Sequence, residues 1–255
     1  MIRACGVSNT GPVRKTNEDT FVSDPDTGLF AVADGMGGHS AGEVASRLAI
    51  ESMTMFVRRS GADTDFSWPY GLDQTLSFDG NRLRTAIYLA NRRVFRAAES
   101  TDDYSGMGTT IVGLLMNGSR FCVAHVGDSR CYLLADGHLQ QLTHDDSWAA
   151  TILARDPALT SEDIARHPMR NVLTNVLGAR EQVDIHMSEH ELRGGEVLLL
   201  CSDGLHGVLN DEAVQDILES TADVDGAAQS LVNTALDRGS RDNVTALVIR
   251  HEADA

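Results

Sequence analysis

The chain has 255 residues, of which 42% are hydrophobic, 23% charged and 5% aromatic; this ordinary globular composition excludes a disordered or fibrous protein. With 21 Lys and Arg against 37 Asp and Glu, the formal net charge is −16, so neither nucleic acid nor an anionic membrane is an expected partner. The length suits one large domain or two small ones, and we predict a single domain over residues 1–255.

Apolar runs and apolar spacing predict the elements of the first half. Runs bounded by turn residues predict strands over 2–8, 20–23 and 29–33. Apolar residues at helical spacing predict one helix over 42–56 and a second over 83–98.

The second half is predicted to hold more strands, then helices, then a final strand. The dipeptides Asn117-Gly118 and Asp136-Gly137 are typical of two-residue hairpin turns and indicate antiparallel pairing. The pattern therefore favours packed antiparallel sheets with helices outside. The predicted strands are 109–116, 121–126, 131–135, 138–142, 183–188, 196–201 and 244–249, and the predicted helices are 211–219 and 226–237.

Two segments interrupt this regular pattern. Residues 61–80 have loop-like composition and are interpreted as an insertion, whose aromatic residues Trp68, Tyr70 and Phe78 are expected to pack onto the core. Residues 147–170 are polar, contain two prolines and are interpreted as a mobile helical excursion.

Lysine and cysteine usage exclude several enzyme classes. Lys15 is the only lysine and follows an arginine, so the chain has no P-loop. None of the four cysteines has CxxC spacing or lies six residues before an arginine, which excludes zinc-knuckle, thioredoxin-type and cysteine-phosphatase sites. We expect reduced, mostly buried thiols in a cytoplasmic protein. The N-terminus lacks the apolar segment of a signal peptide, and no apolar run is long enough to span a membrane.

Acidic residues lie at the ends of predicted strands. Asp34 follows the apolar run 29–33, and Asp128 and Asp203 follow later runs. A carboxylate at the edge of a core is costly unless it is paired, and several converging carboxylates favour hard divalent cations. The other acids in this arrangement are Asp242 before the last strand, and Glu18 and Asp19 before the second.

The charge balance of such a site would suit a phosphate. Asp34, Asp203 and Asp242 carry −3, and two divalent ions carry +4, which leaves +1 to attract a hydroxide and a phosphate anion. The glycines after Asp34 allow the backbone to approach an ion closely. The pattern therefore predicts a metal site.

Eight motifs in order resemble the bacterial type 2C metal-dependent Ser/Thr protein phosphatases over nearly the whole chain. They are Arg14 with Asn17-Glu18-Asp19, Asp34-Gly35-Met36-Gly37-Gly38-His39, Gly106-Met107-Gly108-Thr109-Thr110, Val126-Gly127-Asp128-Ser129-Arg130, Leu142-Thr143 with Asp145, Asn171-Val172-Leu173-Thr174, Cys201-Ser202-Asp203-Gly204-Leu205, and Ser240-Arg241-Asp242-Asn243-Val244-Thr245.

The resemblance implies a four-layer αββα sandwich, in which two antiparallel sheets are flanked by helices. It implies hydrolysis of phosphoserine and phosphothreonine by direct attack of a hydroxide that bridges two Mn²⁺ or Mg²⁺ ions. It also implies phosphoprotein substrates that include a Ser/Thr kinase, and we expect a monomer. Residues 147–170 match the flap segment beside the family's active site.

Roles in the site carry over residue by residue. The two tightly bound ions are assigned to Asp34, the Gly35 carbonyl, Asp203 and Asp242. Asp128 matches the position that shares a third, weaker ion with Asp203. Glu18 and Asp19 match positions that hold metal-bound water, and Arg14 matches the phosphate-binding arginine, whose planar fork suits two phosphoryl oxygens.

The chain departs from the family at two positions. Met36 stands where eukaryotic members have the histidine assigned as general acid, so His39 or a metal-bound water is the candidate acid. Asp146 stands where many members have a histidine, which affects substrate choice at the flap. His125 is expected to be a hydrogen-bonded core residue, and no motif supports a role for the remaining histidines. Those considered are His186, His190 and His206.

Three alternatives remain to be tested. The fold could be a catalytically weak regulatory module that binds phosphoproteins. Gly38-His39-Ser40-Ala41-Gly42 matches the nucleophile elbow of esterases, although the strand predicted to end at residue 33 ends too early for a tight elbow. Residues 24–28 resemble a calcium loop, but a plain turn at Asp24 accounts for them better.

Overall fold

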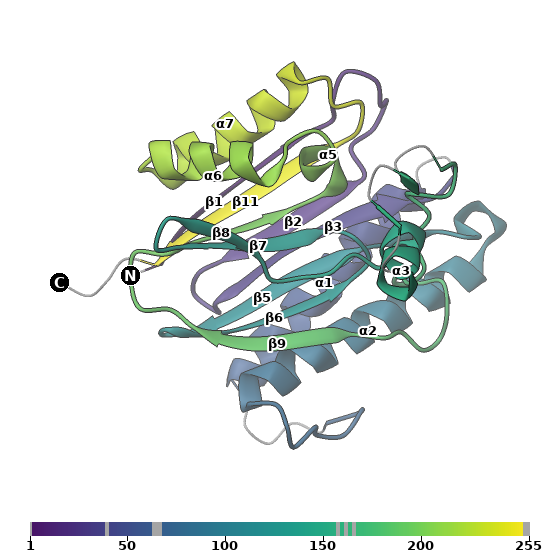
Figure 1. Cartoon of the computed structure of the whole chain (residues 1–255). Coiled ribbons are helices and arrows are strands. Elements are labelled where there is room, and N and C mark those ends of the chain that lie inside the picture. Colours follow the sequence, from purple (N-terminus) through teal and green to yellow (C-terminus); the bar gives the residue numbers. More distant parts are fainter. Residues whose placement is uncertain are drawn as a thin grey trace.

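Two antiparallel β-sheets pack face to face, and helices cover the outer face of each (Figure 1). This computed structural model describes residues 2–38, 41–62, 68–156, 159–160, 163–164 and 167–251. The predicted αββα sandwich is confirmed. Within the described residues the strand order of the first sheet is β1-β11-β10-β7-β8, and that of the second is β2-β3-β5-β6-β9, with β4 paired to β3 beside it.

The strands of each sheet come from distant parts of the chain. The first sheet consists of β1 (Ile2–Asn9), β7 (Arg130–Ala135), β8 (His138–Gln141), β10 (Val197–Cys201) and β11 (Val244–His251). The second consists of β2 (Asp19–Asp24), β3 (Leu29–Met36), β4 (Gly108–Thr109), β5 (Ile111–Asn117), β6 (Arg120–Val126) and β9 (His186–Glu191).

The long helices form the two outer layers (Figure 1). The pair α1 (Ala41–Ala62) and α2 (Phe78–Ser100) covers the second sheet, and the pair α6 (Asp211–Ser220) and α7 (Val224–Asp237) covers the first. Short helices in the described part of the chain lie outside these layers. They are η1 (Asp102–Tyr104), α3 (Trp148–Arg155) and α5 (Asp203–His206).

The apolar run of β3 shows how the layers are held together. Side chains of a strand alternate between its two faces. Ala31 and Ala33 pack in the core beneath α1 and α2, whereas Phe30 and Val32 pack in the core between the sheets. Both faces of the strand are therefore buried, which explains a continuous apolar run in place of an alternating one.

The two predicted hairpins form with slightly different turns. Asp136 and Gly137 have φ values of 51° and 72°, as a turn with two left-handed residues requires, and Ala135 pairs with His138. In the other hairpin Asn117 still belongs to the strand and pairs with Arg120. The loop there is Gly118-Ser119, one residue later than predicted.

Several predicted boundaries were wrong. β3 continues past residue 33 to Met36, because Gly35 and Met36 pair with β4. The strand predicted over 183–188 is β9, which begins at His186, where pairing with His125 of β6 starts. Val183 is buried in the core without a ladder partner.

The insertion predicted over 61–80 is shorter than expected. α1 includes residues 61 and 62, and α2 begins at Phe78 with the Ser77 hydroxyl as its N-cap. The aromatic residues do not enter the core: Trp68 packs edge-on against Phe78, and Tyr70 packs against Tyr88 at the surface of α2. Residues 63–67 lie outside the described part of the chain.

The prediction of unpaired, mostly buried cysteines is confirmed. No described helix is both long and apolar enough to cross a membrane. All four cysteines are free thiols, three of them buried and Cys5 partly so.

Candidate metal centre

Both sheets contribute acids to one edge of the sandwich. Asp19 of β2 lies directly opposite Asp34 of β3 in the second sheet. In the first sheet, Asp203 begins α5 two residues after β10, and Asp242 lies two residues before β11. β10 and β11 are antiparallel neighbours, so Asp203 and Asp242 leave the sheet at the same edge. The predicted convergence of acids is therefore seen in the structure.

Burial and mutual repulsion raise the pKa values of the Asp19, Asp34 and Asp203 carboxyls. Burial raises the pKa of Asp34 well above its usual range, with further increases from the charges of Asp19 and Asp203. Burial also raises the pKa of Asp19 to about 6, against two hydrogen bonds that lower it. The pKa of Asp203 is raised by burial and then by the charge of Asp242. Without cations, the centre therefore holds protons that exposed carboxyls would release.

Asp19 is fixed by hydroxyl groups of the opposite sheet. Its Oδ2 accepts hydrogen bonds from Ser202 Oγ at 2.7 Å and from Thr245 Oγ1 at 2.6 Å. Its Oδ1 is buried and has no hydrogen-bond partner in the described residues, and the same holds for Asp203 Oδ1. A buried carboxylate oxygen without a donor is costly, so these two oxygens fit hard divalent cations.

Gly35 permits a close backbone approach at this edge. A Cβ at this position would overlap the carbonyl of Gly42 in the first turn of α1 and would lie 2.7 Å from the Glu18 carbonyl. The residue is therefore glycine because α1 packs directly against β3 here. The Gly35 amide donates a hydrogen bond to the Glu18 carbonyl at 3.1 Å, which holds Glu18 next to the centre.

Arg14 and Glu18 complete the predicted set. Arg14 Nη2 donates to Asp242 Oδ2 at 2.6 Å, and its side chain remains 50% exposed, so it is accessible to a ligand. The carboxyl of Glu18 lies beside Gly42, and burial raises its pKa. The Glu18 amide donates to Asn243 Oδ1 at 2.8 Å.

Asp128 links the acidic edge, which we define as Glu18, Asp19, Asp34, Asp128, Asp203 and Asp242, to the predicted flap segment 147–170. It follows β6, and burial together with the charge of Asp203 raises its pKa to about 7. Its backbone carbonyl lies 3.0 Å from His206 Nε2. A cavity of about 300 Å³ lies between these residues and the α3 segment. The cavity is lined by Asp128, Arg130, Asp145, Ser147, Ala149, Leu153, Ile164, Arg170, Asn171, Asp203, His206 and Gly207.

Three supporting residues had no role in the sequence analysis. Ser202 and Thr245 hold Asp19, and Asn243 holds both the Glu18 amide and, through Nδ2, the carbonyls of Thr10 and Thr16. Each is within three residues of a predicted metal ligand. A search for hydroxyl and amide side chains beside the strand-end acids would have found them.

Three predicted features remain: the residues His39 and Ser40, and the turn at Asp24. His39, the candidate acid, and Ser40, the candidate esterase nucleophile, lie outside the described residues. The turn at Asp24 is confirmed: its Oδ1 accepts from the Thr27 amide, and its Oδ2 is paired with Arg58 at 2.9 Å. That ion pair neutralises Asp24, which a calcium loop would need as a free ligand.

Comparison with known proteins gives one consistent result. The sequence profile of the protein phosphatase 2C family matches residues 14–238. The serine/threonine protein phosphatase PstP of Mycobacterium tuberculosis is 37% identical over 97% of this chain, but the chain spans only 45% of that relative's length. A serine/threonine phosphatase of Listeria welshimeri is 33% identical, with 95% of this chain and 93% of the relative covered.

Solved structures agree with the sequence comparison. The crystal structure of M. tuberculosis PstP superposes with a TM-score of 0.85 at 36% identity, covering 99% of both chains. A second structure, of the PstP catalytic domain in complex with two manganese ions, superposes with a TM-score of 0.82 at 36% identity and the same coverage.

Proposed function

The chain belongs to the protein phosphatase 2C family, and we propose that it is a Mn²⁺- or Mg²⁺-dependent phosphatase that hydrolyses phosphoserine and phosphothreonine in proteins. The observation that carries the proposal is the acidic edge shared by both sheets. The carboxyls of Asp19, Asp34 and Asp203 have raised pKa values, and two buried oxygens, Asp19 Oδ1 and Asp203 Oδ1, have no hydrogen-bond partner in the described residues. Carboxylate oxygens are the ligands that hard divalent cations prefer.

Four groups would hold two ions, namely the carboxylates of Asp34, Asp203 and Asp242 and the carbonyl of Gly35. The two manganese ions in the PstP catalytic domain support this number. When bound, such ions lower the pKa of a coordinated water to near neutral and offset the charge of the phosphoryl group.

The surrounding acids would serve the same centre. Asp128, whose pKa depends on the charge of Asp203, would share a third and weaker ion with it. Glu18 and Asp19 would accept hydrogen bonds from water in the site. The Ser202 and Thr245 hydroxyls would keep Asp19 in place, so that Oδ1 alone faces that water.

Arg14 would bind the phosphoryl oxygens of the substrate. Its guanidinium is held by one nitrogen to Asp242 and is half exposed, so its other donors are accessible. A planar guanidinium binds two oxygens of a phosphate at once. The source of the proton for the leaving alkoxide remains as predicted, either His39 or water in the site.

The proposal extends to partners and location. We propose phosphoprotein substrates that include a Ser/Thr kinase, with the chain acting as a monomer in the cytoplasm. The names of the relatives support the substrate class. The four free thiols fit a reducing compartment.

A phosphothreonine peptide assay tests the function. We expect phosphate release with Mn²⁺, loss of release in EDTA, and loss of release in Asp203→Asn. The control is Asp216→Asn, which removes an exposed carboxylate of α6 far from the acidic edge in sequence and should behave as wild type.

Two results would contradict the proposal. Phosphate release that persists in EDTA would remove the metal dependence. Mn²⁺ binding to the wild type by calorimetry without release from any phosphopeptide would favour the alternative, a phosphoprotein-binding module of the same fold.

A further inference from the structure

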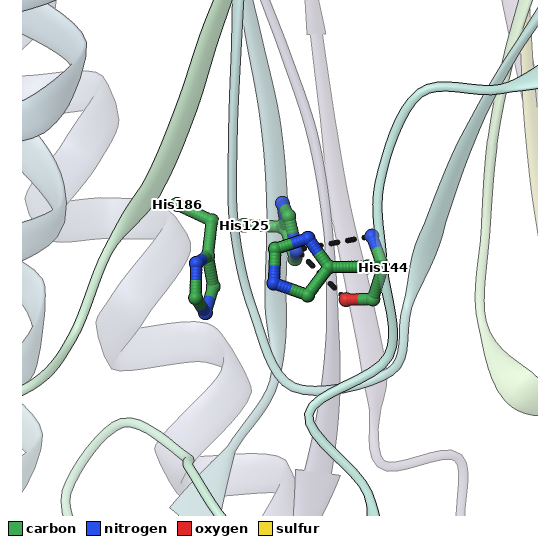
Figure 2. Close-up of side chains that lie close together, drawn as sticks. All are labelled: His125, His144 and His186. Atoms are coloured by element: carbon green, nitrogen blue, oxygen red, sulfur yellow. Dashed lines mark hydrogen bonds between the residues drawn. The ribbon is translucent and has the colours of Figure 1, made fainter. Parts of the chain in front are cut away.

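Three histidines from separate segments meet at one point (Figure 2). His125 is on β6, His144 follows β8, and His186 is the first residue of β9; we name them the imidazole cluster. One ring nitrogen of each lies within 4.8 Å of one from each of the others. The ring centroids of His144 and His186 are 4.0 Å apart.

Polar partners hold two of the rings from outside. His125 Nε2 lies 2.8 Å from the carbonyl oxygen of His144, and His186 Nε2 lies 2.9 Å from Asp146 Oδ1. A proton on His186 Nε2 would leave its Nδ1 with a free lone pair. Histidines that bind metals are oriented in this way, since the second nitrogen donates to a carbonyl or a carboxylate. His125 Nε2 also accepts from the His144 amide at 3.3 Å, so either nitrogen of that ring can carry its proton.

Asp146 is itself firmly placed. Its Oδ2 accepts from the Gly127 amide at 3.0 Å and from Asn175 Nδ2 at 2.8 Å. Its backbone amide donates to the Gly127 carbonyl at 2.9 Å. The carboxylate that orients His186 is therefore fixed by neighbouring segments, which distinguishes this arrangement from an exposed acid that meets a histidine by chance.

Burial decreases across the cluster and gives access to one side. His125 is buried, His186 is partly buried and His144 is exposed. Burial lowers the pKa of His125 to about 4, so that ring is neutral at physiological pH. A core role explains His125, but it leaves His144 unexplained, because no hydrogen bond holds its ring within the described residues.

We propose that the imidazole cluster binds one Zn²⁺ ion, or a similar borderline transition-metal ion, through three imidazole nitrogens with a fourth position open to solvent. Nitrogen donors select such ions over Mg²⁺ and Mn²⁺, which prefer oxygen. Ligand distances of about 2.0–2.1 Å require nitrogens about 3.4 Å apart. The exposed His144 ring is free to rotate inward and close the remaining distance.

The bound ion would link three parts of the fold. It would join β6, β9 and the segment that leads from β8 into α3, next to the turn that carries Asp128. The site is separate from the acidic edge in both residues and donor type, and its existence does not depend on the proposed phosphatase activity.

Zinc titration of the full chain against a competing chelating dye tests the proposal. The titration uses the Asp203→Asn variant, so that the acidic edge binds less zinc. Wild type is titrated in parallel. We expect one tightly bound Zn²⁺ in Asp203→Asn and at least that one in wild type. Asp146→Asn, which weakens the orientation of His186, should raise the Kd by about 10–100-fold. His144→Gln and His186→Gln, which remove ligands, should raise it further.

A matched control and a spectrum separate ligation from folding. His190→Gln removes a histidine of the same strand that stacks on Phe121 and contacts Ser188, so its zinc affinity should equal that of wild type. Co²⁺ bound in place of zinc should give a visible absorption band that disappears in His144→Gln. The proposal is overturned if His144→Gln binds zinc as wild type does, or if Asp203→Asn abolishes zinc binding.

Discussion

The acidic edge and the imidazole cluster lie on two sides of one turn and differ in how their polar groups are satisfied. Asp128 of that turn belongs to the acidic edge, and the Gly127 amide is bound by Asp146 of the cluster. The acidic edge accumulates like charges that raise one another's pKa values. In the cluster, His125 and His186 each have one ring nitrogen with a polar partner, and the His144 ring is exposed. The acidic edge is therefore destabilised when no cation is bound, whereas the imidazole cluster is stable with or without a metal ion.

Asp34→Asn gives the largest expected effect and tests the first half of this comparison. The change removes a proposed metal ligand, and the loss of several kcal/mol of charge stabilisation should lower turnover by at least about 10³-fold. It also removes a carboxyl that burial and the charges of Asp19 and Asp203 keep protonated at a cost in folding free energy, so the metal-free protein should become more stable and its Tm should rise.

Activity and thermal unfolding of Asp34→Asn, each with EDTA and with Mn²⁺, provide the measurement. The exposed control Asp216→Asn should change neither quantity. A variant that loses activity together with metal-free stability would show that Asp34 has a structural role and that repulsion at the acidic edge is not the dominant effect.

The pH dependence of stability sharpens the comparison. The folded pKa of Asp128 is about 7, against an ordinary value of 3.8, so the folded chain retains a proton that the unfolded chain has released. Wild type therefore loses stability relative to Asp128→Asn as pH rises from about 4 to about 7, by up to a few kcal/mol. Comparing the two proteins cancels the opposite slope of His125 and His206, whose pKa values burial lowers to about 4.

Urea unfolding of both proteins across this pH range tests the prediction. In EDTA, the stability advantage of Asp128→Asn should grow with pH. In Mn²⁺ the advantage should shrink, because a cation compensates the ionised carboxylate of wild type. An advantage that is constant with pH in EDTA would mean that Asp128 ionises freely.

The acidic edge could be predicted from sequence, and the cluster could not. Asp34 and Asp203 each follow an apolar run, so both were expected where a strand leaves the core. His125, His144 and His186 meet only because β6 pairs with β9 in a register that places His125 opposite His186. That strand is polar, with the sequence His-Met-Ser-Glu-His-Glu, and the apolar residues before it shifted the predicted strand to 183–188.

The limits of the fold prediction have the same physical cause. Apolar periodicity identified both sheets and the long helices, because these elements bury a face. It missed α5 and did not separate β4 from β5; these short elements, of four and two residues, are held by backbone hydrogen bonds and by pairing with β3. It also shortened β3, whose last residues, Gly35 and Met36, pair with β4 without extending the apolar run.

Arg14→Ala should have an intermediate effect. A charge-assisted hydrogen bond to phosphate contributes about 1.5–3 kcal/mol, so kcat/KM should fall by about 10–100-fold, mainly through a higher KM. The matched control is Lys15→Ala, which removes the neighbouring exposed cation and should leave both constants near wild type. Steady-state kinetics with a phosphothreonine peptide in Mn²⁺ measure kcat and KM for both variants. Equal losses in the two variants would indicate general attraction of the substrate in place of a specific contact.

His144→Gln should have the smallest effect when zinc is absent. The side chain is exposed and its ring has no hydrogen bond within the described residues, so the free energy of unfolding in EDTA should change by less than about 0.5 kcal/mol. With zinc at about 100 times its Kd, wild type should gain about 2.7 kcal/mol, and the variant should gain far less. Thermal unfolding with and without zinc measures both differences. A large loss of stability in EDTA would mean that the cluster supports the fold without metal, and the contrast with the acidic edge would then fail.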